Sequence, residues 1–154
     1  MLSKKDIEII SHLRNNARKK ITTISRQTNI PVTTIYDKVR VHERKFIKKH
    51  TSLLDFQKMG FLATAHIAIK VEKDSREALQ KFLLEKPNIN SLYKTNFGTD
   101  LLAEGIFKDT AELQNFKEEI EEKFHTNEIR IFNIIEELKK EEFLTKKEHF
   151  KEEK

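Results

Sequence analysis

The sequence predicts an α+β fold in two parts, in which three short helices precede a β-α-β-β-α-β segment. Three observations support this prediction. Apolar residues recur at helical spacing in the first 47 residues, and every second residue is apolar over residues 61–72. The tetrapeptides that begin at Asp74 and Asp109 share the pattern D-x-x-E, lie 35 residues apart, and each open a helical pattern. The second part therefore consists of two similar halves.

The first two helices are expected to be short. Ser3 is expected to cap the first helix, with Asp6 three residues later as in a capping box. The apolar face of this helix consists of Ile7, Ile9, Ile10 and Leu13. Thr22 or Thr23 is expected to cap the second helix, which barely makes two turns. Asn29 suits the left-handed turn that follows it.

The third helix is expected over residues 32–45, directly after Pro31, which suits a helix entry. Its apolar face follows the spacing i, i+4, i+7 and i+11 and consists of Ile35, Val39, His42 and Phe46. A short helix, a tight turn and a longer helix form the helix-turn-helix pattern, whose second helix enters the major groove of DNA.

The second part is expected to form a four-stranded antiparallel sheet. The strands are expected at residues 61–72, 89–96, 100–107 and 129–135. With the two helices between them they give the split βαβ, ferredoxin-like order, which places both helices on one face of the sheet. The other face is predicted to carry Leu62, Leu102, Ile106, Phe132 and Ile134. An apolar face without a cover predicts a homodimer that forms through the sheet.

These elements divide the chain into four segments. We expect a helix-turn-helix domain at residues 1–47, a hinge at 48–60, a ferredoxin-like domain for dimerisation and effector binding at 61–136, and a charged tail at 137–154. From residue 136 onward, 13 of 19 residues are charged, which predicts a solvated helix or a frayed end. Alternatively, the tail packs on a neighbouring subunit through Leu138, Phe143, Leu144 and Phe150.

Charge is distributed unevenly between the two parts. The 154 residues carry a formal net charge of +5. Residues 1–58 hold 14 basic and 5 acidic residues, a net charge of +9, whereas the remainder holds 16 basic and 20 acidic residues, a net charge of −4. A basic first part suits a polyanionic partner, double-stranded DNA, because lysine and arginine neutralise phosphates and release counterions.

Several classes of protein are excluded by missing features. Without cysteine, the chain has no disulfide framework, thiolate zinc site or cysteine nucleophile. It contains no signal peptide and no apolar run of about 20 residues, so we expect a cytoplasmic protein that does not enter a membrane. Glycine-rich phosphate loops, nucleophile motifs and closely spaced histidine pairs are also missing, so we expect neither an enzyme nor a bound cofactor or metal.

Several segments together resemble one family. The hinge keeps Ile47, Leu54, Asp55 and Gly60 at the spacing of the motif I-x-x-Y-x-A-x-L-D-P-x-x-L-G. Further matches are Leu2, Asp6, Ile10 and Leu13 of the first helix, Arg18 after that helix, and Val39, Arg40, Glu43 and Arg44 of the third. On these residues the chain resembles the Lrp/AsnC family, the leucine-responsive or feast/famine regulators, over about residues 2–136. Two departures are His42 in place of a leucine and a third helix that ends without the family's glycine.

The resemblance implies a DNA-binding transcriptional regulator that dimerises, assembles further into tetramers or octamers, and responds to an amino acid. It also points to the loop Gly98, Thr99 and Asp100 as the effector site. In this loop glycine lies two residues before aspartate, whereas the family usually has three. The other interpretation of the loop is a simple β-turn.

Candidate DNA contacts follow from the predicted third helix. The residues expected to read bases are Thr33, Thr34, Tyr36, Lys38 and Arg40. The residues expected to contact phosphates are Arg18, Lys19, Lys20, Arg26 and Arg44. Two other functions remain open at this point. One is an architectural protein that coats DNA with little sequence preference, and the other is a metabolite-binding module without a DNA function.

Overall fold

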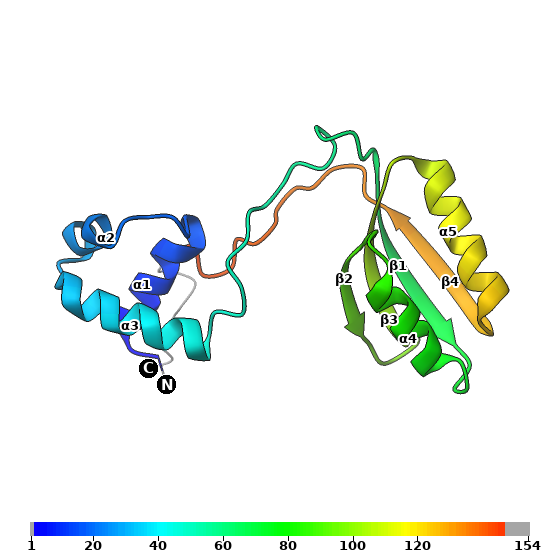
Figure 1. Ribbon diagram of the computed structural model, residues 1–154, viewed down its shortest axis with the longest axis horizontal. Coiled ribbons are helices and arrows are strands. Elements are labelled where there is room, and N and C mark those ends of the chain that lie inside the picture. The colour runs from blue at the N-terminus through cyan, green and yellow to red at the C-terminus, as the bar shows by residue number, and fades with distance from the viewer. Residues whose placement is uncertain (1, 147–154) are drawn as a thin grey trace. The chain divides into compact units, whose positions relative to one another are not determined.

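The computed structural model describes residues 2–146 of the chain, and the end of the tail, including Phe150, lies outside them. Two compact units make up these residues. One unit is Leu54–Glu137, and the other consists of the residues up to Leu53 and from Leu138 onward. The element order confirms the predicted α+β class, a helix-turn-helix followed by a β-α-β-β-α-β domain (Figure 1).

The first unit contains three helices, α1 (Lys4–Asn15), α2 (Ile21–Thr28) and α3 (Val32–Lys45). Its apolar core cluster is small and consists of isoleucines, at least one from each helix and one from the turn before α3. These are Ile9, Ile24, Ile30 and Ile35. Ile9, Ile24 and Ile35 lie on the inward-facing side of their helices, as the apolar periodicity predicts.

Local sequence signals account for two of the helix ends in this unit. Ser3 and Asp6 form the complete capping box that the sequence predicts for α1, and Asn29 adopts the left-handed conformation with φ of 56°. The predicted cap of α2 was wrong. The helix begins one residue before Thr22, so Lys20 occupies the N-cap position and no side chain bonds the free amides. Phe46 was also misplaced, because α3 ends before it and leaves its ring half exposed.

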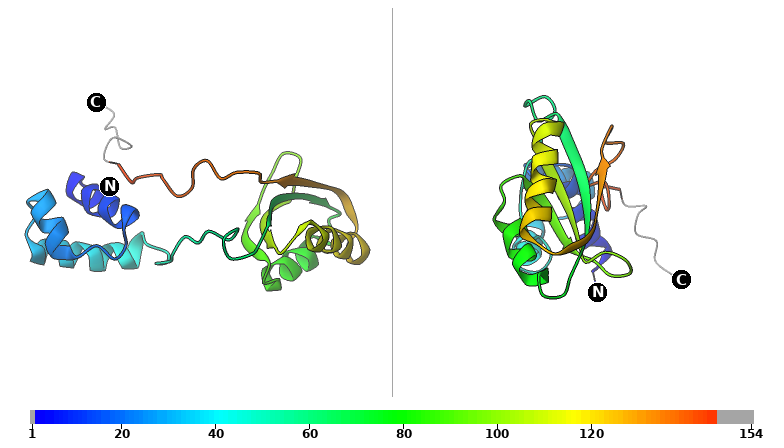
Figure 2. Two further views of the ribbon diagram at one scale, coloured as in Figure 1. Left: turned by 90° about the horizontal axis from the view of Figure 1, so that it is seen from above. Right: turned by 90° about the vertical axis from the view of Figure 1, so that its right-hand side faces the viewer.

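The second unit is a four-stranded antiparallel sheet in the order β2-β3-β1-β4. Its strands are β1 (Ala63–Val71), β2 (Ile89–Lys94), β3 (Leu101–Phe107) and β4 (Thr126–Asn133). The two crossover helices are α4 (Arg76–Glu85) and α5 (Thr110–Lys123). Alternate residues of β1 pack in one core with apolar residues of both helices, so α4 and α5 cover the same face (Figure 2).

Several strand ends differ from the sequence prediction by one to three residues: β1 is shorter at both ends, β2 ends two residues earlier, β3 begins one residue later and β4 is shifted toward the N-terminus. Strand β4 begins three residues before Ile129, because its pairing with β1 continues past a bulge to Val71 and Thr126. The two D-x-x-E tetrapeptides also behave differently. The Asp109 carboxylate accepts a hydrogen bond from the Glu112 amide at 2.9 Å and caps α5. Helix α4 starts after Ser75 without a side-chain cap, so Asp74 does not have this role.

The face of the sheet away from the helices is partly apolar. Phe132 of the edge strand β4 is 53% exposed there, and Tyr93 of β2, at the opposite edge of the sheet, is 58% exposed. Leu102 is half-buried on the same face, and Ile106 is buried. Within residues 2–146, no helix combines the length and the apolar character that a membrane span requires.

Candidate DNA interface

Helix α3 has one side in the core and one side in solvent. Ile35 and His42 are buried on the inner side. Thr33, Tyr36 and Arg40 are exposed, and their spacing of three and four residues aligns them in one stripe. The Arg40 guanidinium lies 5.9 Å from the centre of the Tyr36 ring, a cation–π distance. Three of the five residues predicted to read bases therefore form a continuous outward surface.

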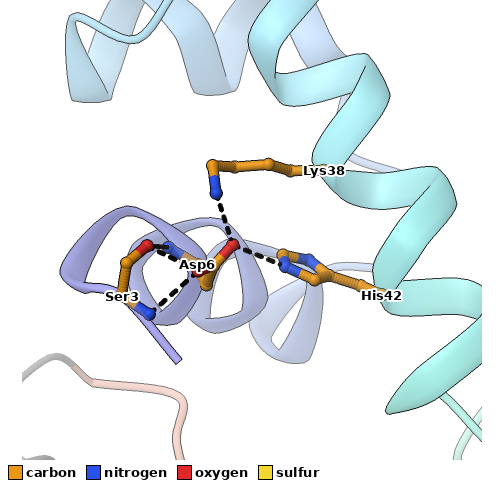
Figure 3. A network of polar contacts seen from close by, with 4 residues as sticks. All are labelled: Ser3, Asp6, Lys38 and His42. Carbon is orange, nitrogen blue, oxygen red and sulfur yellow. Dashed lines mark hydrogen bonds and ion pairs between the residues drawn. The ribbon is translucent and has the colours of Figure 1, made fainter. Parts of the chain in front are cut away.

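The other two predicted base-reading residues are placed differently. Thr34 and Lys38 are half-buried. The Lys38 ammonium lies 2.8 Å from the Asp6 carboxylate of α1, so it points toward the neighbouring helix (Figure 3). Lys38 therefore ties α3 to α1 in this structure, and its base contact stays a prediction that requires this ion pair to open.

Asp6 is the centre of a polar network between α1 and α3 (Figure 3). One carboxylate oxygen accepts from Lys38 and lies 2.9 Å from the His42 Nε2, while the other accepts from the Ser3 amide at 2.9 Å. Burial raises the pKa of the Asp6 carboxyl, but the hydrogen bonds from Lys38, Ser3 and His42 outweigh burial. The pKa therefore lies far below its ordinary value of 3.8.

This network explains why a histidine is tolerated in the core of the first unit. His42 is only 1% exposed, and its Nε2 has a carboxylate partner, although its Nδ1 has none among the described residues. The sequence identified Asp6 as a helix cap and His42 as a core residue. The pairing between them was missed, because the two residues are 36 positions apart and no local pattern connects them.

Replacing Asp6 with asparagine is expected to lower the free energy of unfolding at pH 7 by about 1–3 kcal/mol, because buried His42 and half-buried Lys38 lose a charged partner. A lowered pKa means that this stabilisation is present above about pH 4 and is lost as the pH falls further. Urea denaturation of Asp6→Asn and the unaltered chain between pH 7 and pH 3 measures the difference. Asp37→Asn, on an exposed carboxylate of α3, is the control. A difference that stays constant with pH would contradict the role of Asp6.

The predicted phosphate contacts surround α2 and the end of α3. Arg18, Lys20, Arg26 and Arg44 are exposed. Lys19 is half-buried, with its ammonium 2.9 Å from the Nδ1 of His12. Arg18, Lys19 and Lys20 directly precede the uncapped start of α2. Free backbone amides and positive charge therefore occur together at that helix end.

The predicted effector loop has a defined geometry around Asp100. One carboxylate oxygen accepts from the Val71 amide at 2.9 Å, and the other lies 2.7 Å from the Arg76 guanidinium. Both oxygens therefore already have partners within the chain. Gly98 adopts a φ of 109° with open space around it, and Phe97 beside it is 99% exposed. In residues 2–146, no group of three metal-ligating side chains occurs.

Known proteins are similar to this chain in sequence and in fold. The chain is 30% identical to the HTH-type transcriptional regulator FL11 of Pyrococcus horikoshii over 112 residues, 72% of this chain and 74% of that protein. No family model matches the sequence. The transcriptional regulator NMB0573 of Neisseria meningitidis, solved in complex with L-Met, has a TM-score of 0.82 at 19% identity and covers 91% of this chain and 94% of its own. LrpC of B. subtilis gives a TM-score of 0.82 at 18% identity over 90% of this chain and 98% of its own.

The structural neighbours share the two-part fold over about nine-tenths of this chain, and the sequence similarity to FL11 extends over 72% of it. FL11 and NMB0573 are both named as transcriptional regulators. Together with the exposed stripe of α3, this relationship confirms the resemblance that the hinge and helix motifs indicate. The chain is a DNA-binding helix-turn-helix transcriptional regulator and belongs to the Lrp/AsnC family.

Proposed function

We propose that this regulator recognises a specific sequence in double-stranded DNA through the exposed stripe of α3. The observation that carries the proposal is the alignment of Thr33, Tyr36 and Arg40 on the solvent side of a helix that follows a tight turn. A hydroxyl, a phenol and a guanidinium provide hydrogen-bonding groups for base edges in the major groove. The cluster of exposed basic residues around α2 supplies the phosphate contacts that position this helix without reading sequence.

The functional form is proposed to be a homodimer that forms through the open face of the sheet. Phe132 and Tyr93 are exposed aromatic side chains on that surface, and their burial between two copies would be favourable. A dimer presents two copies of α3, which suit two half-sites about one helical turn, roughly 34 Å, or a multiple of it apart. A larger ring of dimers would present more copies of α3 and could bind more half-sites along the same DNA.

Binding of an amino acid is proposed at the loop Gly98–Asp100. The Neisseria regulator was solved with L-Met, which supports a small amino acid as the effector class. Gly98 leaves open space beside the main chain, where backbone amides could bind a carboxylate. Because Asp100 is paired with Arg76 and the Val71 amide, an incoming ammonium group would have to compete for that carboxylate.

Selection of bound genomic DNA fragments by the purified chain tests this function. A specific regulator is expected to enrich fragments that share a palindromic site, since a symmetric dimer reads symmetric half-sites. Repeating the selection with an amino-acid mixture tests the effector, which is expected to change the amount or pattern of recovered DNA. Binding without any shared sequence would instead indicate an architectural protein. No retardation of any DNA at about 150 mM salt would indicate a metabolite-binding module.

A further inference from the structure

The last described residues of the chain lie against α1. Thr145 is buried, although the segment around it is among the most charged in the chain. From Leu138 onward the described residues belong to the compact unit of α1, α2 and α3, although the strand before them, β4, belongs to the sheet unit. The expected solvated helix is not found in the described part of this tail.

Arg14 of α1 provides most of the attachment. Its Nε donates to the Phe143 carbonyl oxygen at 3.0 Å, and its Nη2 donates to the Glu141 carbonyl oxygen at 2.8 Å. Its Nη1 lies 3.0 Å from the Glu141 carboxylate. All three nitrogens of one guanidinium thus bind a single short segment, a geometry that the compact ammonium of lysine cannot reproduce.

Two further side chains of α1 bind the same segment. The buried Ser11 hydroxyl donates to the Thr145 carbonyl oxygen at 3.3 Å, and the Asn15 amide donates to the same oxygen. Ser11, Arg14 and Asn15 lie at i, i+3 and i+4, so they form one face of the helix. This face recognises mainly backbone carbonyls of the tail.

The tail segment itself has a specific shape. Glu141 and Leu144 both adopt positive φ, 54° and 61°, which is uncommon and unfavourable for residues other than glycine. The Thr145 hydroxyl donates to the Glu142 carbonyl oxygen at 2.8 Å and closes a turn between them. A frayed end would relax to ordinary backbone angles, so the contacts with α1 are what support this conformation.

We propose that residues 141–145 form a strap that binds α1 through hydrogen bonds and gives the DNA-binding unit a second, noncovalently anchored connection to the sheet unit. The chain leaves the first unit after Leu53 and re-enters it at Leu138. With the strap bound, two connections instead of one limit the positions that the DNA-binding unit can reach. Its consequence for DNA rests on the proposed function: in a dimer, the strap restricts the spacing of half-sites that both copies of α3 can occupy.

Two kinds of variant separate the strap from other roles of α1. Arg14→Lys keeps the positive charge but loses the paired donors, and the double variant Ser11→Ala with Asn15→Ala removes both donors to Thr145. Lys5→Ala is the matched control, because Lys5 is an exposed cation of the same helix. Tryptic cleavage after Lys139 and Lys140, followed by mass spectrometry, reports release of the strap. Both strap variants are expected to be cleaved about fivefold faster or more, and the control at the rate of the unaltered chain.

The consequence for DNA is measured with duplexes whose two half-sites are separated by different spacers. The unaltered chain is expected to prefer one spacer by about tenfold, and the strap variants by less than about threefold. Unchanged cleavage in both strap variants would overturn the strap itself. Faster cleavage with an unchanged spacer preference would overturn its effect on spacing. If the unaltered chain bound no DNA, the proposed function would fail, while the cleavage comparison would still decide the strap.

Discussion

Replacing Arg40 with alanine is expected to lower affinity for the selected DNA site by about 10- to 100-fold, while affinity for random-sequence DNA falls less than about threefold. Arg40 is exposed in the outward stripe of α3, and its guanidinium can donate two hydrogen bonds to the O6 and N7 atoms of guanine. Fluorescence anisotropy with both duplexes at the same salt concentration measures the two affinities.

Arg44→Ala is the matched comparison for this experiment. Arg44 is exposed in the last turn of α3, where we expect a phosphate contact rather than a base contact. Its loss is therefore expected to weaken binding to both duplexes equally. The slope of log affinity against log salt concentration is expected to become shallower by about one, the value for one lost phosphate contact. Equal losses for Arg40→Ala on both duplexes would contradict base reading by Arg40, although DNA binding itself would stand.

Much of the fold could be predicted because its signals are local. The alternation in β1 and the capping box at Ser3 and Asp6 involve residues a few positions apart, and both are found as expected. The uncapped start of α2 was missed for the opposite reason. Two threonines suggested a side-chain cap, but the helix extends back to Ile21. Packing of apolar residues against the other helices determines that start more strongly than a cap.

The candidate site was harder to predict because its polar contacts join distant parts of the chain. The apolar periodicity of α3 predicts that Lys38 faces solvent, yet its side chain forms an ion pair with Asp6 of α1. The strap on Arg14 involves residues from the two ends of the sequence. Periodicity shows which face of an element is apolar, but it does not show where a long charged side chain finds its partner.

Replacing Phe132 with aspartate is expected to convert the dimer into monomers at micromolar concentration, raising the dimer dissociation constant by about 100-fold or more. Phe132 is exposed in the single chain, on the sheet face opposite α4 and α5, so the change places a charge at the proposed interface without entering the core. Analytical ultracentrifugation measures the change in mass. The monomer is expected to lose about 100-fold in affinity for a duplex with two half-sites, because the second α3 no longer binds intramolecularly.

Leu84→Asp separates loss of the interface from a general effect of the new charge. Leu84 is 66% exposed on α4, which covers the other face of the sheet, so this variant introduces the same carboxylate away from the proposed interface. It is expected to remain a dimer and to bind DNA like the unaltered chain. If Phe132→Asp also remained a dimer, the two copies would have to meet elsewhere. Both variants are expected to bind a duplex with a single half-site as tightly as the unaltered chain does, because each copy of α3 remains folded in its own unit.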